Sequence, residues 1–149
     1  MLVYLDNCSY NRPFDNLSYD SIRMEAEAKI FIQSLIKYGM IKLINSFILT
    51  YEISKSPSRY KKEHISAFIE KNASGYIGGE NKEIVVKISQ EIAATGIKFI
   101  DAAHISCAII AKCDYFITTD KRVLKYKSDK IKLVNPVVFV KIWEGNYGE

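Results

Sequence analysis

Residues 2–6 read Leu2-Val3-Tyr4-Leu5-Asp6, a short apolar run that stops at a carboxylate. A run of this length, bounded by turn residues, predicts a buried strand. A second run, Tyr115-Phe116-Ile117-Thr118, is rich in aromatic and β-branched residues and leads into Thr119-Asp120. If the two strands are parallel neighbours, Asp6 and Asp120 are expected to lie together at one edge of a sheet.

Helices and strands alternate along the rest of the chain. Residues 7–16 are turn-rich, and residues 72–79 are expected to form a glycine-rich loop. Two further strands are expected at 40–44 and 131–134. Helices are expected at about 21–38, 47–55, 58–71, 80–95, 100–112 and 120–126, and a terminal helix from Pro136. This alternation predicts an α/β fold, namely a three-layer α/β/α sandwich with a central, mostly parallel sheet. The 149 residues contain no long linker, so a single domain over 1–149 is expected.

The first long helix, expected from about Ser21 to Tyr38, has apolar residues at the 4-3-4-3 spacing of one buried face. These residues are Met24, Ala28, Phe31, Leu35 and Tyr38. Gly39 is expected to end the helix, because glycine readily adopts the left-handed conformation found after helix ends.

Composition excludes several classes of protein. Hydrophobic residues make up 48% and charged residues 26%, which is typical of a globular chain and not of a disordered one. The net charge of +4 permits a polyanionic partner without requiring one. No apolar run approaches the roughly 18–20 residues of a membrane helix, and the N-terminus lacks the basic lead of a secretory signal. The odd, widely spaced set of Cys8, Cys107 and Cys113 predicts reduced core thiols and a cytoplasmic location.

Ligands of parallel α/β sheets bind beyond the carboxyl ends of the strands, which singles out four acids. Asp6 and Asp120 follow strands, Glu52 lies in the helix after the second strand, and Asp101 opens the helix at 100–112. Two such charges 4 Å apart repel by about 4 kcal/mol at an effective dielectric constant of about 20. A cluster of them would hold protons with raised pKa values or bind cations. Oxygen ligands suit Mg²⁺ or Mn²⁺, and zinc is not expected because the set has no His or Cys.

Each acid also has a local explanation. Asp6 could bind turn amides, Asp101 could complement a helix dipole, Glu52 could be a surface residue, and Asp120 could be an N-cap. The hypothesis therefore depends on the set and not on any one member. Asp114 is excluded, because it precedes the strand that Asp120 follows and lies roughly 20 Å away.

The order and spacing of these motifs resemble a PIN domain, the fold of the VapC-type toxin ribonucleases. The resemblance covers nearly the whole chain. It depends on the N-terminal apolar run that ends in Leu5-Asp6, on Glu52 in the middle of the chain, and on the segments Asp101-Ala102-Ala103-His104 and Thr118-Thr119-Asp120. The opening Leu5-Asp6-Asn7-Cys8-Ser9-Tyr10-Asn11-Arg12-Pro13-Phe14-Asp15 is similar to the LDN…NRPFD signature of one branch of that superfamily. The chain departs from the family at Asn7, where many members carry Thr or Ser.

The resemblance implies an acidic Mg²⁺ or Mn²⁺ pocket that cleaves single-stranded RNA to 5′-phosphate and 3′-hydroxyl ends. Carried over by position, the catalytic set is Asp6, Glu52, Asp101, Asp120 and the hydroxyl of Thr118. We expect Asp6 and Asp101 to bind metal directly and Asp120 to bind it directly or through water. Glu52 is expected to orient or deprotonate water.

An acidic pocket needs cations around it to hold RNA. Arg12, Lys121 and Arg122 are the best candidates for phosphate contacts. The run Arg59-Tyr60-Lys61-Lys62, with Tyr51 nearby, is either a single-strand binding platform or a solvated helix face. His104 shares a helix face with Asp101, and it is either a contact of Asp101 or a partly buried structural residue.

Possible protein partners are an antitoxin and a second copy of the chain. For the homodimer, Phe139, Trp143 and Tyr147 could supply a terminal apolar patch.

Two other functions stay open. A catalytically inactive PIN-fold module could bind RNA or protein without turnover, although inactive copies usually lose several acids and this chain has candidates for all four. A haloacid-dehalogenase-like phosphatase would use Asp6 as its nucleophile, but that family requires Asp-x-Asp and the third position here is Cys8.

Overall fold

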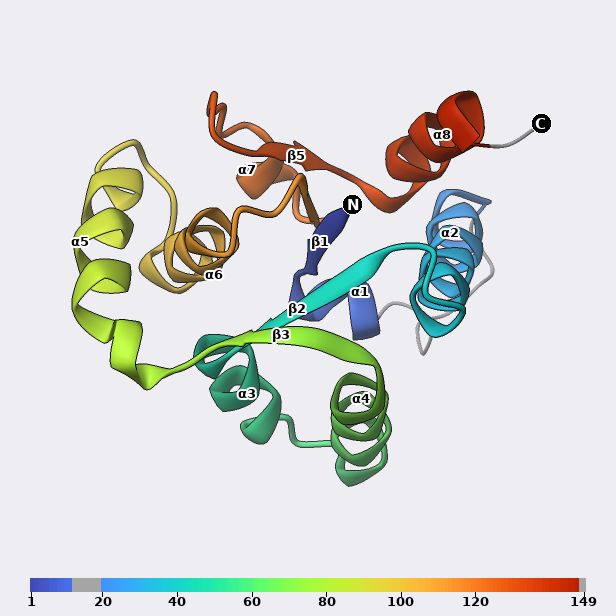
Figure 1. Cartoon of the computed structure of the whole chain (residues 1–149), viewed down its shortest axis with the longest axis horizontal. Coiled ribbons are helices and arrows are strands. Elements are labelled where there is room, and N and C mark those ends of the chain that lie inside the picture. Colours follow the sequence, from blue (N-terminus) through green and yellow to red (C-terminus); the bar gives the residue numbers. More distant parts are fainter. Residues whose placement is uncertain (12–19, 148–149) are drawn as a thin grey trace.

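The computed structural model of the protein describes residues 1–11 and 20–147. The strands are β1 (Leu2–Leu5), β2 (Lys42–Ser46), β3 (Ala73–Ile77), β4 (Tyr115–Ile117) and β5 (Lys132–Val134). The helices are α1 (Asn7–Asn11), α2 (Asp20–Lys37), α3 (Phe47–Ser54), α4 (Arg59–Asn72), α5 (Lys82–Ala93), α6 (Phe99–Ile110), α7 (Lys121–Leu124) and α8 (Pro136–Tyr147), and η2 (Gly79–Asn81) is a 3₁₀ turn. Figure 1 shows the strands running through the middle of the molecule between two groups of helices.

The five strands form one sheet in the order β3-β2-β1-β4-β5, and every neighbouring pair is parallel. The expected α/β fold is therefore confirmed, with a sheet that is parallel throughout. The chain fills the sheet outward from β1 to β3 on one side and then returns to place β4 on the other side of β1. The strand order thus reverses between β1 and β4, which is the position where α/β sheets bind their ligands.

Both faces of the sheet are covered, which explains why β1 is apolar at every position. Val3 and Leu5 point into one core cluster, which also contains residues of α2, α3, α4 and α8. Tyr4 points into the other cluster, with residues of α5, α6 and α7. Alternate residues of one strand therefore serve opposite layers, and the expected three-layer sandwich is confirmed.

The expected loop at 72–79 is wrong, because residues 73–77 form the edge strand β3. β3 pairs with β2 through a register shift between Leu43 and Ile44, and Gly75 lies opposite Ile44. A Cβ atom on Gly75 would lie 2.8 Å from Ile44 Cδ1, so a larger residue here would require the end of the Ile44 side chain to move. Glycine inside a strand marks such a close approach, and it does not indicate a loop by itself.

The predicted buried face of α2 is confirmed for Ala28 and Leu35 and wrong for the other three residues. Met24 and Tyr38 are 52% and 83% exposed, whereas Ile32 and Ile36 are buried. The helix has enough apolar residues to form two stripes, and packing on the sheet selected the one through Ile32 and Ile36. Gly39 does follow the helix with φ +73°, as expected.

Helix α1 replaces the first part of the expected turn-rich stretch, and the rest of that stretch lies outside the described residues. The fully buried Lys29 of α2 donates from Nζ to the carbonyl oxygen of Cys8 at 2.7 Å. This bond ties α2 to α1, directly beside Asp6. The amphipathic pattern of the helix gives no sign of a buried lysine.

The expected terminal apolar patch is wrong for Phe139 and Trp143, the two of its residues whose side chains are described. Phe139 is fully buried and Trp143 is 7% exposed, because α8 packs against α2 and the sheet. The side chain of Tyr147 lies outside the described part of the chain. The exposed apolar residues in this region are instead Met24, Ile30 and Phe31 of α2 and Val138 of α8.

All three cysteines are free. Cys107 and Cys113 lie in the core as expected, and burial raises the pKa of Cys107 to about 11 and that of Cys113 to about 12. Both are therefore inert, protonated thiols at neutral pH. Among the described helices, none is both long and apolar enough to cross a membrane.

Candidate metal centre

Asp6 follows β1 at the carboxyl edge of the sheet and is held in place on several sides. Its backbone N–H donates to Ile117 at 3.0 Å, which continues the ladder between β1 and β4. Its Oδ1 accepts the backbone N–H of Asn7 at 2.7 Å, and its Oδ2 accepts the hydroxyl of Thr118 at 2.8 Å. The thiol of Cys8 lies 3.6 Å from the same Oδ2. Asp6 therefore binds a turn amide, as its local explanation suggested, and also contacts Thr118, which follows β4.

Thr118 and Asp120 occupy the corresponding position after β4. The Oγ1 of Thr118 donates to Asp6 and accepts the backbone N–H of Asp120 at 3.1 Å. Asp120 is the N-cap of α7, with its Oδ1 accepting from Arg122 N at 2.9 Å. One carboxylate oxygen serves this cap, and the other is available for a second partner.

Glu52 reaches the same edge from α3, the helix that follows β2. Its Oε1 lies 2.8 Å from Nε2 of His104, and its side chain is 30% exposed. Asp6, Glu52 and His104 each place one potential ligand atom within 4.8 Å of the other two, so this group could hold a metal ion. The sequence suggested no histidine ligand, and the structure places His104 next to two of the candidate acids.

Asp101 lies in the first turn of α6, where it experiences the charges of the other acids. Burial, and to a smaller extent the charges of Asp6 and Asp120, raise the pKa of Asp101 from 3.8 to about 6. Glu52 also raises this pKa, and His104 lowers it. The four acids identified from the sequence thus lie in one negative field, despite coming from four different segments.

The sequence left two roles open for His104, a contact of Asp101 or a partly buried structural residue. It is fully buried, and its Nδ1 lies 2.6 Å from the Tyr4 hydroxyl. It contacts Glu52 and not Asp101 through a hydrogen bond, because α6 turns its imidazole toward α3. The only sequence signal was its position three residues after Asp101, which places both on one side of the helix.

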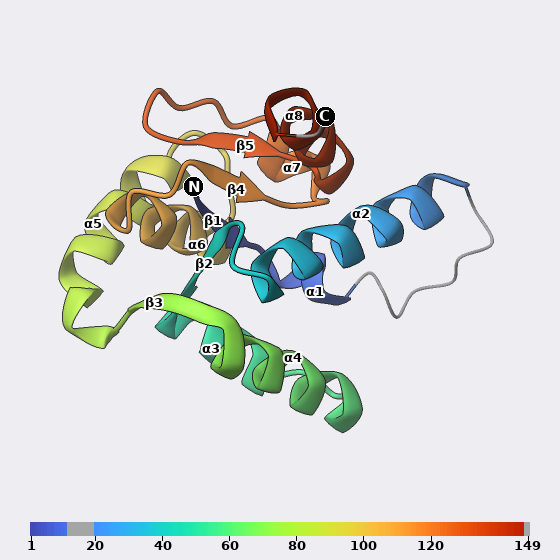
Figure 2. The same cartoon turned by 45° about the vertical axis from the view of Figure 1, so that its right-hand side comes forward.

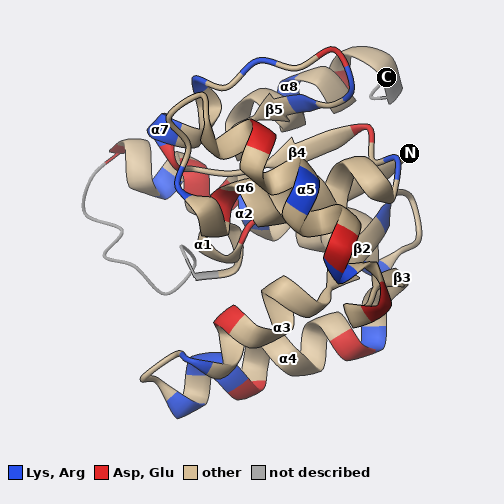
Figure 3. Cartoon of the chain, turned by 90° about the vertical axis from the view of Figure 1, so that its left-hand side faces the viewer, with Lys and Arg blue, Asp and Glu red and all other residues tan. Residues whose placement is uncertain are grey.

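The basic residues expected near the acids are partly described. Lys121 and Arg122 are exposed at the start of α7, directly after Asp120. Arg12 lies outside the described residues. In the run of residues 59–62, Arg59 pairs with Glu63 at 2.8 Å, and Figure 3 shows basic residues gathered where α3 leads into α4.

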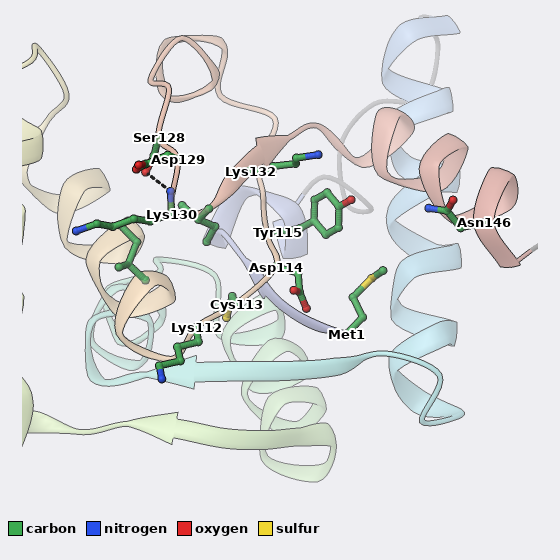
Figure 4. A pocket seen from close by; sticks show the side chains of 12 residues that line it. Met1, Lys112, Cys113, Asp114, Tyr115, Ser128, Asp129, Lys130, Lys132 and Asn146 are labelled. Carbon is green, nitrogen blue, oxygen red and sulfur yellow. Dashed lines mark hydrogen bonds between the residues drawn. The ribbon is translucent and has the colours of Figure 1, made fainter.

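The opposite edge of the sheet holds a pocket of about 980 Å³, shown in Figure 4. Asp114 and Asp129 line it together with Lys112, Lys130 and Lys132. Asp114 Oδ2 accepts the backbone N–H of Leu2 at 2.8 Å, at the start of β1. Asp114 is therefore separated from the acid cluster by the length of the strands, in agreement with its exclusion.

We expect Asp101→Asn to stabilise the metal-free protein above pH 6. The pKa of this carboxyl rises from 3.8 to about 6 on folding, so the folded state disfavours its charged form. A shift of about two pH units corresponds to at most about 3 kcal/mol. Solvent screening of this partly exposed group lowers that to about 1 kcal/mol, or a rise in Tm of roughly 2–4 °C.

The gain should disappear as pH falls below about 4, where the carboxyl is protonated in both folded and unfolded states. It should also shrink or reverse in Mg²⁺, because a bound ion stabilises the native wild type. Thermal unfolding at several pH values, with and without Mg²⁺, measures both effects. Equal shifts of Tm in all buffers would place Asp101 outside any metal site.

These observations define a class of structure. It is an α/β/α fold with a parallel five-stranded sheet and with acidic residues near the position between β1 and β4 where the strand order reverses. No protein-family model matches the sequence, and no curated protein matches it. Among solved structures, it is similar to VapBC2 from Rickettsia felis bound to a DNA fragment from their promoter, with 19% identity and a TM-score of 0.54 over 91% of this chain and 98% of that chain.

Two further neighbours support the same fold. FitAcB from Neisseria gonorrhoeae is 15% identical, with a TM-score of 0.53 over 90% of this chain and 97% of that chain. FitAB bound to an IR36 DNA fragment is 15% identical, with a TM-score of 0.56 over 91% and 95% of the respective chains. At these identities the likeness shows a shared PIN-like fold.

Proposed function

We propose that this chain is a metal-dependent endoribonuclease that hydrolyses single-stranded RNA, and that it is the toxin of a toxin–antitoxin pair. The observation that carries the proposal is the position of Asp6 and Glu52, which together with His104 place ligand atoms within 4.8 Å of one another at the switch point of the sheet. Burial and the charges of Asp6, Asp120 and Glu52 raise the pKa of Asp101 nearby. Acids that repel one another in this way are stabilised by a divalent cation.

The donor set fits Mg²⁺ or Mn²⁺. Both ions prefer oxygen ligands, and carboxylates supply most of the candidate ligands here. Within the described residues, no Lys or Arg forms an ion pair with any of the four acids. Among residues 1–11 and 20–147, no lysine or arginine therefore offsets their charge. Asp6, Asp101 and Asp120 would hold the ion.

The ion would neutralise charge at phosphorus and on the leaving oxygen, and would make water more acidic. Glu52 would orient the attacking water and take its proton. The bond between phosphorus and the 3′ oxygen would break, leaving a 5′-phosphate and a 3′-hydroxyl. Thr118 donates to Asp6 Oδ2, so its role is to fix the orientation of that carboxylate.

RNA would reach the acids over two basic regions. Lys121 and Arg122, beside Asp120, would contact phosphates. Helices α3 and α4 pack side by side (Figure 2), and exposed Tyr51 on α3 has Lys55 Nζ 5.2 Å from its ring centre. Exposed aromatic rings next to cations are typical of surfaces that stack single-stranded bases.

An antitoxin partner is supported by two features together. The sequence resembles VapC-type toxins, and one structural neighbour is VapBC2 bound to a DNA fragment from their promoter. A second copy of this chain is a further possible partner, although Phe139 and Trp143 do not form the surface first expected for it.

Cleavage should require a divalent ion. With a random-sequence single-stranded RNA pool, we expect cleavage in Mg²⁺ or Mn²⁺, reduction to background in excess EDTA, and recovery when Mg²⁺ is restored. Gel analysis measures the rate, and sensitivity of the products to a 5′-phosphate-specific exonuclease identifies their ends.

Cleavage that continues unchanged in EDTA would contradict the proposal. Absence of cleavage by a folded protein that binds Mg²⁺ would favour the inactive PIN-fold module instead. In that case, substitutions in the acid cluster should alter partner binding alone.

A further inference from the structure

A line of buried hydrogen bonds connects the start of α3 to Glu52 on the same helix. The Ser46 hydroxyl lies 2.7 Å from the Tyr4 hydroxyl, which lies 2.6 Å from His104 Nδ1. His104 Nε2 in turn lies 2.8 Å from Glu52 Oε1. Ser46, Tyr4 and His104 are all 0% exposed, so water does not compete for the bonds among these three residues.

The direction of each bond follows from the groups involved. An ionised carboxylate can only accept, so His104 Nε2 carries the proton that points to Glu52. A neutral ring then has a bare Nδ1, which accepts the Tyr4 hydroxyl. The Tyr4 oxygen in turn accepts the Ser46 hydroxyl, and Ser46 Oγ accepts the backbone N–H of Leu49 at 3.1 Å. Every buried donor and acceptor in the line is satisfied.

Packing holds the same groups in place. The Tyr4 ring stacks on Phe116 with centroids 5.3 Å apart and meets the His104 ring edge-on at 5.7 Å. Ser46 is the N-cap of α3, so the helix that carries Glu52 is attached at its start as well as at Glu52 itself. Helix α3 is therefore attached to β1 and α6 at two points, through Ser46 at its start and through Glu52. Two points of attachment fix the rotation of the helix about its axis.

We propose that His104, oriented by Tyr4, is the positioning residue that holds Glu52 toward the acid cluster. One carboxylate oxygen of Glu52 is engaged by His104, which leaves the other for the reacting water. The catalytic consequence rests on the proposed function, whereas the hydrogen-bond arrangement is a property of the metal-free chain. Direct ligation of a metal by His104 would require breaking its bond to Tyr4 or to Glu52.

The arrangement can be read from ¹⁵N-histidine NMR spectra of the metal-free protein. The chain has two histidines, and His64 is exposed, so His64→Gln assigns the remaining signals to His104. We expect His104 to show a proton on Nε2 and an unprotonated Nδ1, and Tyr4→Phe to weaken that preference. A proton on Nδ1 alone, or averaging between both nitrogens as for an exposed ring, would overturn the inference.

Adding Mg²⁺ separates positioning from ligation. If His104 positions Glu52, its Nε2 proton stays in place when Mg²⁺ is added. Loss of the Nε2 proton, with a large shift of that nitrogen, would show direct ligation and overturn the inference.

Two substitutions then test the effect on catalysis. His104→Leu keeps an apolar side chain of similar size without a donor, and we expect it to lower kcat by roughly 10–100-fold. KM for RNA and the rise of Tm in Mg²⁺ should stay near their wild-type values. His104→Gln keeps an N–H donor that reaches toward Glu52 and should recover part of kcat.

Ser106→Ala is the matched control, because Ser106 is a buried polar residue of α6 whose bonds go to Ser89 and the carbonyl of Ala102. It should keep wild-type kcat. A wild-type kcat for His104→Leu, or an equal loss in Ser106→Ala, would overturn the inference. If wild-type protein shows no metal-dependent cleavage, the proposed function fails. The ¹⁵N-histidine NMR spectra, with and without Mg²⁺, still show whether His104 donates to Glu52 as inferred.

Discussion

Asp6→Asn is expected to lower the rate of RNA cleavage by at least about 10²–10³-fold, the usual effect of removing one group that stabilises charge in a transition state. Asparagine keeps the size of the side chain and can still accept the Asn7 N–H, but it has no negative charge to offer a cation. The Thr118 hydroxyl can rotate to accept from the new amide, so the fold should persist. Single-turnover cleavage at saturating Mg²⁺ measures the effect.

Asp129→Asn is the matched control, because Asp129 is an exposed acid that lines the pocket at the opposite edge of the sheet. It loses the same charge and should cleave at the wild-type rate. Equal loss in both variants would point to overall charge and not to a site at Asp6. Undiminished cleavage by Asp6→Asn would remove Asp6 from the metal centre.

Phe139→Ala should destabilise the protein by about 3–5 kcal/mol, as is usual when a fully buried aromatic ring is deleted. Phe139 is 0% exposed, and its ring meets the Tyr115 ring edge-on with centroids 5.4 Å apart. Removing it would leave a cavity between α8 and the sheet. A fall in Tm of roughly 10 °C is expected for a chain of this length, and urea unfolding would give the free energy directly.

Val138→Ala provides the comparison on the same helix. Val138 is 41% exposed, and its substitution should change stability by no more than about 0.5 kcal/mol. If Phe139→Ala were equally mild, α8 would not cover the sheet as described. Retained stability with a new tendency to dissociate would instead support the surface role first expected for this residue.

The acid cluster shows how far a pattern along the chain can lead to a site. Asp6 and Asp120 were identified because a strand that ends in a carboxylate predicts its position at the carboxyl edge of a parallel sheet. Glu52 and Asp101 were selected by their place after buried segments, and the structure puts both in the same electrostatic field. Their roles as ligand or base stay predictions that the substitutions above test.

The errors have a common origin. Three glycines at 72–79 suggested a loop, but residues 73–77 pair with β2 as an edge strand. The apolar residues of α2 allowed two buried faces, and contact with the sheet selected Ile32 and Ile36 over Phe31 and Tyr38. Phe139 and Trp143 were expected to form a surface patch, but α8 packs over the core and buries both side chains. Each error depended on which surface a segment meets, and a local pattern does not contain that information.

The alternation of strands and helices and the acids at the strand ends can be predicted from the sequence alone, because both follow from local periodicity and chain direction. The contacts of His104 with Glu52 and Tyr4, across 52 and 100 residues of sequence, depend on the packed fold. Such contacts arise when distant segments pack together and buried polar groups must find partners. The chemistry of the acids was therefore readable from the chain, whereas the support that orients Glu52 depended on packing.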